Sequence, residues 1–274
     1  MTTASAPTAP AAAAPAASRS AGRRYRHALW LLTIRDLRVR YSTSALGYFW
    51  SILDPLVMSA IYWFVFTQVF HRGSVGEEPY IVFLLSALLP WMWFTGAVSD
   101  STRAFIKETK LIRSTTIPRS IWVARVTASK GIEFLLSLPV LAVFAIATGA
   151  HWHWEIALYP LAIVLQCALV YGLGLIVAPL VVFFRDLERA VKLVLRFLFY
   201  ASPIIYGTSA LPDKLHDLAA FNPLSGIFGI YRAAFFPSQL NWFEVGVSVV
   251  VTVVVLAIGL VVFRRSEHRV LKEL

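Results

Sequence analysis

The sequence predicts an all-α, polytopic integral membrane protein with six transmembrane helices. Apolar residues make up 58% of its 274 residues and charged residues only 15%. Soluble globular proteins are typically about half apolar and a quarter charged. Mean hydropathy is +0.69. Apolar runs long enough to cross a bilayer, about 20 residues, recur along the chain, and cationic residues gather in alternate connections between them.

The N-terminal part divides into a tail and a helix. Residues 1–22 are rich in Ala, Pro, Ser and Thr and lack the apolar core and basic start of a signal peptide, so we expect a disordered tail. Residues 23–46 are basic and amphipathic, which predicts a helix lying along the membrane surface. Its spacing places Trp30, Ile34, Leu37 and Tyr41 on one face, with Arg35, Arg38 and Arg40 pointing away.

Six apolar runs follow, and we interpret each as a span. They cover residues 47–70, 80–99, 119–149, 156–184, 190–206 and 242–263. The fifth run is marginal in length, and a broken apolar stretch with Asn, Pro and Gly follows it at 218–237. We expect residues 190–237 to form one span and then short helices that re-enter the outer leaflet. Residues 264–274 are expected to be a C-terminal tail.

The distribution of positive charge predicts the orientation. Twenty of the 25 Lys and Arg residues lie in residues 1–46, 100–120, 185–196 and 264–274, whereas three lie in residues 71–79, 150–155 and 207–241. Short cytoplasmic connections carry the excess of positive residues. Both termini are therefore predicted to be cytoplasmic. In a soluble protein this cationic excess would suggest nucleic-acid binding, but its arrangement favours a membrane protein that binds no nucleic acid.

Motifs for catalysis are missing from the sequence. It has no phosphate-binding Gly-rich loop with Lys, no Asp-x-Asp pair, no zinc-protease motif and no nucleophile elbow. The single cysteine, Cys167, excludes an intramolecular disulfide. His151, His153 and Glu155 alternate with tryptophans, and we interpret this outer loop as an interfacial aromatic anchor and not as a metal site. No catalytic residue, metal site or cofactor is predicted for this chain.

Three stretches occur in an order that is typical of one family. They are Arg35–Tyr41 with Ser44–Trp50 and Asp54–Pro55, then Leu111–Arg113 with Pro118–Arg119, then Phe221–Leu224 with Tyr231–Arg232. Over about residues 25–270, this set resembles the permease of the ABC-2 type polysaccharide exporters. That family moves O-antigen, capsule, teichoic acid or galactan chains, often linked to lipid, across the plasma membrane.

The resemblance implies several partners. A second copy of the chain would pair with the first, and two separate ABC ATPase subunits would bind ATP and Mg²⁺. The lipid-linked polysaccharide would pass between the two permeases. The chain itself would be a transport subunit of the plasma (inner) membrane and not an enzyme.

The connection at 101–118 alternates cationic and apolar residues and is a candidate for coupling to the ATPase. An amphipathic segment with an apolar knob can dock in a partner's groove. The alternative is that its charges only set topology. The candidate coupling residues are Arg103, Phe105, Lys107, Lys110, Leu111, Ile112 and Arg113. The helix at 23–46 has a comparable second role, as a gate, with Trp30, Arg35, Arg38 and Tyr41 as its candidates.

Aromatic and charged residues in apolar surroundings are candidates for the substrate path. Sugar rings stack on aromatic rings, and a charge inside a span usually faces water or the bundle interior. The candidates are Tyr62, Trp63, Phe66, Asp54 and Arg232. For the aromatic residues the alternative is a lipid-facing belt, and for Arg232 it is a pair with a carboxylate such as Asp217. Glu133 is expected to pair locally with Lys130.

Other functions remain open from the sequence. An ABC-2 permease for a drug or a lipid is the main alternative. A membrane glycosyltransferase is disfavoured because acidic motifs are missing, and a scaffold without transport activity is the fourth possibility.

Overall fold

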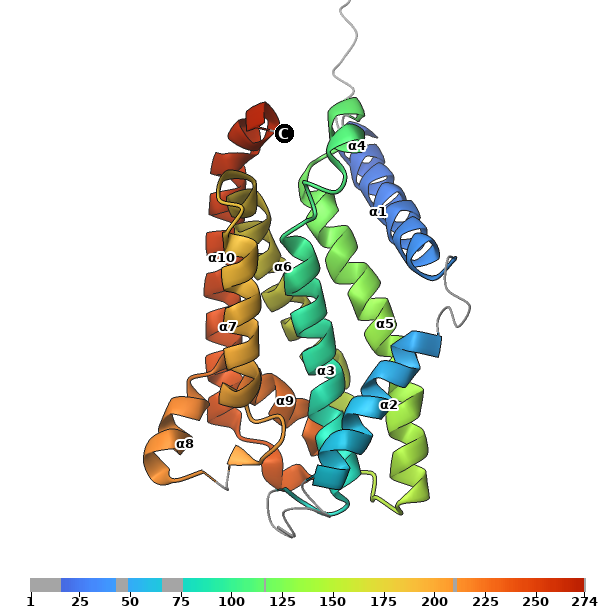
Figure 1. Ribbon diagram of the computed structural model, residues 1–274, viewed down its shortest axis with the longest axis vertical. Helices are drawn as coiled ribbons and strands as arrows, with labels where there is room; N and C mark the ends of the chain where they lie inside the picture. Colours follow the sequence, from blue (N-terminus) through green and yellow to red (C-terminus); the bar gives the residue numbers. More distant parts are fainter. Residues whose placement is uncertain (1–15, 43–48, 66–75, 116, 209–210, 274) are drawn as a thin grey trace, which may run out of the picture.

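The chain folds into a bundle of helices. The computed structural model describes residues 16–42, 49–65, 76–115, 117–208 and 211–273, and within these ranges it contains helices and no strands. The predicted all-α class is therefore confirmed. Most of the longer helices run side by side (Figure 1). Their bounds are α1 Ala16–Ser42, α2 Trp50–Trp63, α3 Tyr80–Ser101, α4 Thr109–Ser114, α5 Ser120–Ala147, α6 Tyr159–Phe183, α7 Leu187–Ala201, α8 Asp213–Ala220, α9 Pro223–Ala233 and α10 Trp242–Glu273, with 3-10 turns η3 Trp154–Leu158 and η5 Pro237–Gln239.

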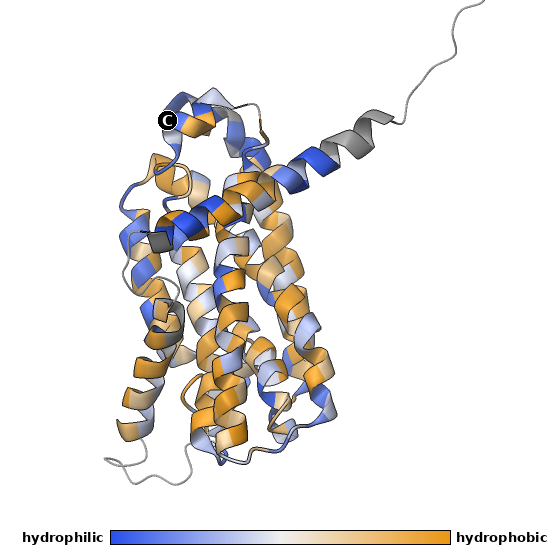
Figure 2. Cartoon of the chain, turned by 90° about the vertical axis from the view of Figure 1, so that its right-hand side faces the viewer, coloured by the Kyte–Doolittle hydropathy of each residue, from blue (hydrophilic) through white to orange (hydrophobic). Residues whose placement is uncertain are grey.

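Four helical stretches among the described residues are long and apolar enough to cross a membrane. They are Tyr80–Ser101, Ser120–Ala147, Trp154–Phe183 and Trp242–Glu267. These stretches agree with four of the predicted spans. Hydrophilic residues gather toward the ends of the bundle and apolar residues along its length (Figure 2). The chain is therefore a multi-pass membrane protein.

The two remaining predicted spans correspond to shorter helices. α2 has 14 residues and α7 has 15, fewer than the about 20 that a perpendicular crossing needs. The predicted span 47–70 also extends into residues outside the described ranges. α7 ends at Ala201 because Pro203 follows, and Ser202 is extended, with φ −100° and ψ 148°, as is usual before proline.

Both termini of the described chain are more helical than the sequence predicts. α1 begins at Ala16, inside the expected tail, where alanines favour helix. α10 continues through the predicted C-terminal tail to Glu273. This extension is held in place because Val270 is buried in a cluster with Phe105 and Phe263.

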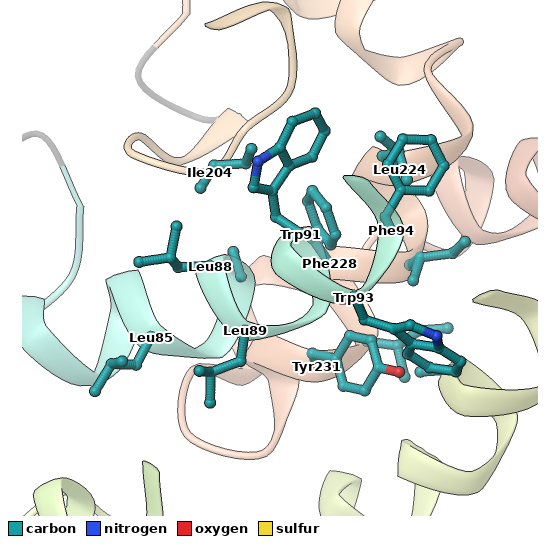
Figure 3. Close-up of a cluster of buried hydrophobic side chains, with 14 of the residues drawn as sticks. Leu85, Leu88, Leu89, Trp91, Trp93, Phe94, Ile204, Leu224, Phe228 and Tyr231 are labelled. Carbon is teal, nitrogen blue, oxygen red and sulfur yellow. The ribbon is translucent and has the colours of Figure 1, made fainter. Parts of the chain in front are cut away.

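α3 lies at the centre of the fold. In its most apolar window 78% of the residues are buried, against 22% for α10. Trp91, Trp93 and Phe94 extend from α3 among side chains of α9 and the segment after α7 (Figure 3). A helix that is apolar on all sides is stable when other helices surround it.

α9 is a buried helix at the end of the bundle opposite α4. Ten of its 11 residues are buried, and it lies with α8 at the lower end in Figure 1. Asn222 caps it by accepting a hydrogen bond from the Leu224 N–H at 3.0 Å, and the Asn222 amide donates to the Ser202 hydroxyl at 2.9 Å. Pro223 then occupies the first helical position, where no N–H is needed.

Candidate functional site

A groove with aromatic walls lies between α2, α3 and α7. Its volume is about 410 Å³. It is lined by Met58, Tyr62, Leu88, Trp91, Met92, Thr95, Ser99, Lys192, Leu195, Arg196, Phe199 and Tyr200. Phe199 lies at its centre, with ring centroids 5.7 Å from Tyr62 and 5.6 Å from Trp91. The groove therefore offers flat apolar surfaces beside hydroxyl groups and two cations.

The two cations come from one face of α7. Lys192 and Arg196 are four residues apart, one helical turn, and both side chains are exposed. Lys192 also donates to Glu188 at 2.7 Å. Arg196 makes no ion pair within the described residues.

The structure separates the predicted path residues of the first span. Tyr62 lines the groove, whereas Trp63 and Asp54 lie on other exposed parts of α2. Phe66 lies outside the described residues. Trp91, Phe199 and Tyr200 were not predicted as a set, since two helices far apart in sequence bring them together. The spacing of Lys192 and Arg196, one helical turn apart, does indicate that they share a face of α7.

Arg232 is buried and does not line this groove. Its guanidinium donates to the carbonyls of Ile204 at 2.7 Å, Tyr206 at 3.3 Å and Phe83 at 3.4 Å, and it lies 3.8 Å from the centroid of the Phe83 ring. The proposed path role is therefore not supported by its position. Arg232 binds two carbonyls of the segment that follows α7 and one carbonyl of α3.

The connection between α3 and α5, here residues 102–119, alternates buried and exposed residues. Phe105 and Ile112 are buried within this chain. They are therefore not exposed to dock in a groove of an ATPase, as the sequence suggested. Ile106 is 45% exposed, while Leu111 is half-buried. The cations Arg103, Lys107, Lys110 and Arg113 are all exposed.

One cation of this connection binds α7. Arg103 donates to Glu188 through Nε at 2.9 Å and Nη2 at 2.5 Å. Because Glu188 also accepts from Lys192, the α3–α5 connection is joined to the helix that carries the cations of the groove.

A network of eight charged residues joins α1 to the rest of the bundle, and we call it the α1 charge network. It holds four cations and four carboxylates, so its formal charge is zero. Its members are Arg35, Asp36, Arg40, Asp100, Glu108, Arg125, Lys130 and Glu133. The expected Lys130–Glu133 pair is confirmed at 2.7 Å, and Arg40 approaches the same carboxylate at 3.5 Å.

This network gives two of the three α1 arginines partners within the chain. Arg35 pairs with Glu108 of the α3–α5 connection, and Arg40 pairs with Asp100 of α3 and Glu133 of α5. Arg38 is exposed and makes no ion pair among the described residues. Trp30 is exposed, whereas Leu37 of the same predicted face is buried. The side chain of Tyr41 lies outside the described part of the structure.

Glu108 is the most connected carboxylate of the network. Both of its oxygens accept from Arg35 Nη2 at 2.9 Å, and one accepts from Arg125 Nη1 at 3.0 Å. Burial raises the pKa of Glu108, but the hydrogen bonds from Arg35 and Arg125 lower it by more, so it lies below its ordinary value. Glu108 is therefore ionised at neutral pH. Sequence analysis missed this residue, although it is the one acidic residue among the cations of the connection.

The loop between α5 and η3, which carries two histidines, is arranged as a set of exposed aromatic side chains. No group of three His, Cys, Asp or Glu residues in the described structure is arranged to hold a metal. Trp154 is 72% exposed, and Trp152 packs on Phe235 with the rings tilted by 59° and their centroids 4.9 Å apart. The exposed indole fits the predicted interfacial anchor.

Comparison with known proteins assigns this architecture to a family. The profile of the family described as ABC-2 type transporter matches residues 27–236, which is most of the chain. The chain belongs to the ABC-2 type transporter family.

Three relatives of this ABC-2 transporter align over most of their length. It is 34% identical over 243 residues to the O-antigen export system permease protein RfbA of Klebsiella pneumoniae, covering 87% of this chain and 92% of the relative. It is 31% identical over 218 residues to the O-antigen export system permease protein RfbA of Myxococcus xanthus, covering 79% and 83%. Identity to the polysialic acid transport protein KpsM of Escherichia coli is 26% over 256 residues, covering 88% and 93%.

Proposed function

We propose that this chain is the membrane-spanning permease of an ATP-driven exporter that moves lipid-linked polysaccharide from the cytoplasmic to the outer side of the plasma membrane. Relatives named for O-antigen export and for polysialic acid transport support a polysaccharide as the cargo. The groove between α2, α3 and α7 is the structural observation that carries the proposal.

The walls of the groove suit a glycan. Apolar C–H faces of sugar rings stack on aromatic rings, while hydroxyl groups need hydrogen-bonding partners. Tyr62, Trp91, Phe199 and Tyr200 supply the rings. Tyr62, Tyr200, Thr95 and Ser99 supply hydroxyls. A chain of sugars can slide along such a surface because no single contact is strong.

Arg196 supports a water-filled path. It is exposed nine residues after the start of α7, which is about 13 Å along the helix at 1.5 Å per residue. A charged side chain deep in a bilayer costs about 2.5–3.5 kcal/mol when it faces lipid. The cost is avoided if Arg196 faces an aqueous route, and a second copy of the chain would enclose such a route.

The remaining parts of the proposal concern topology and partners. α2 and α7 would complete six crossings, α8 and α9 would re-enter from the outer side, and both termini would be cytoplasmic. The exposed residues of the α3–α5 connection, Ile106, Lys107, Lys110 and Arg113, would contact one of two ABC ATPase subunits that bind ATP and Mg²⁺.

Depletion of the protein tests the function directly. We expect lipid-linked glycan to accumulate on the cytoplasmic leaflet, measured by the accessibility of the glycan to a lectin in inside-out and right-side-out vesicles. Loss of glycan synthesis would point to an enzyme, and unchanged glycan with altered drug sensitivity would point to a drug exporter. Either result would contradict the proposal.

The groove is tested with a matched pair of variants on α7. Tyr200→Ala removes an exposed ring that lines the groove, and Phe197→Ala removes an exposed ring of the same helix that does not. We expect Tyr200→Ala to slow glycan export by roughly two- to tenfold, since a lost stacking contact is worth about 0.5–1.5 kcal/mol. Equal effects of the two variants on export per folded protein would show that the groove is not the route.

A further inference from the structure

The position of Glu108 joins three parts of the fold. It lies in the α3–α5 connection directly before α4, and its side chain is only 10% exposed. Arg35 comes from α1 and Arg125 from α5, and both donate to it. Glu108 is the one carboxylate of the connection, and Asp100 of α3 makes a similar pair of contacts, with Arg40 of α1 at 2.8 Å and Lys130 of α5 at 3.9 Å.

The hydrogen bond from Arg125 attaches Glu108 to α5. Arg125 is buried, with its guanidinium 5.4 Å from the centroid of the Trp122 ring. A buried cation without a counter-ion is strongly destabilising. Asp36, at 3.8 Å, is the second carboxylate near it and also accepts from the Ser129 hydroxyl at 3.1 Å. Glu108 is therefore held to α5 whether or not α1 is bound.

An apolar cluster accompanies these ion pairs. Phe105 and Ile112 of the connection are buried with Trp122 of α5, and Tyr25, Leu29 and Leu32 of α1 pack against the same cluster. α1 is thus attached to the connection by ion pairs at Arg35 and by apolar contacts along its N-terminal half. Figure 1 shows α1 running beside α5 and reaching α4 at the upper end of the bundle.

We propose that Glu108 is a positioning residue that fastens α1 to the α3–α5 connection, so that the two move as one body when an ATPase pushes on the connection. This inference rests on the proposed function, because it assumes that the connection receives the movement of an ATPase. The bond from Arg35 Nη2, shared between the two Glu108 oxygens, is the exchangeable part of the attachment, since the Arg35 side chain is 44% exposed whereas Arg125 is buried.

A substitution in α1 alone can remove the ion pair between α1 and the α3–α5 connection. Arg35→Ala removes the bond to α1 and leaves the Glu108–Arg125 pair in place. Arg38→Ala is the matched control, an exposed arginine of the same helix without an ion pair among the described residues.

A spin label at His27→Cys in a Cys167→Ser background reports the mobility of α1. We expect Arg35→Ala to raise the ratio of mobile to immobile label roughly two- to fivefold, the effect of losing a partly exposed ion pair. Arg38→Ala should leave it unchanged. Equal mobility in both variants would overturn the proposal.

A cross-link then tests whether the two parts move together. In a second protein without Cys167 and without the spin label, Arg35→Cys with Glu108→Cys allows a short bismaleimide to join α1 to the connection. We expect this double variant to have reduced ATP-dependent transport before cross-linking and to regain transport once the two cysteines are joined. Loss of transport on cross-linking would show that α1 must separate from the connection and would overturn the proposal. Label mobility needs neither glycan nor ATPase, so a failure of the proposed function would leave this readout intact.

Discussion

At the scale of single residues, burial decides which role a charged side chain has. Arg232 is one of two cations in residues 207–241, Lys214 being the other, and from sequence it suggests contact with substrate. In the fold it is enclosed by α3 and the segment after α7, and its donors are used by three carbonyls. Backbone carbonyls must be hydrogen-bonded when they are buried. Arg232 meets this requirement for two carbonyls of the segment after α7 and one of α3.

Replacement of Arg232 is therefore expected to affect folding first. Arg232→Ala should lower the free energy of unfolding by roughly 3 kcal/mol, because it leaves a cavity and buried carbonyls without donors. Arg196→Ala, at an exposed arginine of the groove, should change it by less than about 0.5 kcal/mol. Thermal unfolding in detergent measures both. Normal stability of Arg232→Ala together with lost transport would favour a role in the substrate path instead.

At the scale of helices, small residues allow α6 and α10 to touch. A methyl group on Gly259 would lie 2.4 Å from the carbonyl oxygen of Gly172, and one on Gly172 would lie 2.9 Å from the Leu256 Cα. In a membrane, helices associate through close packing since lipid is as apolar as the side chains, and glycine permits the closest approach. α10 is otherwise mostly exposed, so this contact is central to its attachment.

This contact is tested by two glycines of the same helix. Gly259→Ala should lower the free energy of unfolding by about 1–3 kcal/mol, since the backbone of α6 must shift. Gly246→Ala is the control, because nothing lies within 4 Å of the added methyl group, and it should be neutral or slightly stabilising. Unfolding in detergent at increasing temperature compares them. Similar effects of both substitutions would mean that α6 and α10 do not pack through these glycines.

At the scale of the whole molecule, charge separates the two ends of the bundle. The α3–α5 connection, the start of α7 and the extended end of α10 carry cations and lie at one end, while α8, α9 and the loop before η3 lie at the other (Figure 1). Such an asymmetry is what the positive-inside rule expects of a membrane protein.

Accessibility of single cysteines tests this arrangement in intact cells, again without Cys167. Cysteines at Arg113 and Arg189 should react only with reagents that enter the cytoplasm, and cysteines at Trp154 and Leu218 should react from outside. All four positions are exposed. The pair Arg189 and Leu218 tests whether α7 crosses the membrane despite its 15 residues. Labelling of both from one side would exclude that crossing.

Features that depend on neighbouring residues were predicted correctly from the sequence, whereas contacts between residues far apart in the chain were not. Long apolar runs identified α3, α5, α6 and α10, because helix formation and membrane insertion depend on neighbouring residues. The end of α7 was harder to place, since Pro203 interrupts an apolar run that continues beyond it. Contacts between distant segments were missed: Glu108 with Arg35 joins residues 73 positions apart, and no local pattern indicates that pair.

By itself, the sequence determined the all-helical membrane class, four of the crossings and the family of ABC-2 type transporters, because hydropathy and short ordered motifs are local properties. The tertiary structure decided which residues share a site. It buried Arg232, Phe105 and Ile112, brought rings from α2, α3 and α7 into one groove, and paired the arginines of α1 with carboxylates of other helices. The reason is that burial and ion pairing depend on the packing of helices far apart in the chain, which periodicity does not encode.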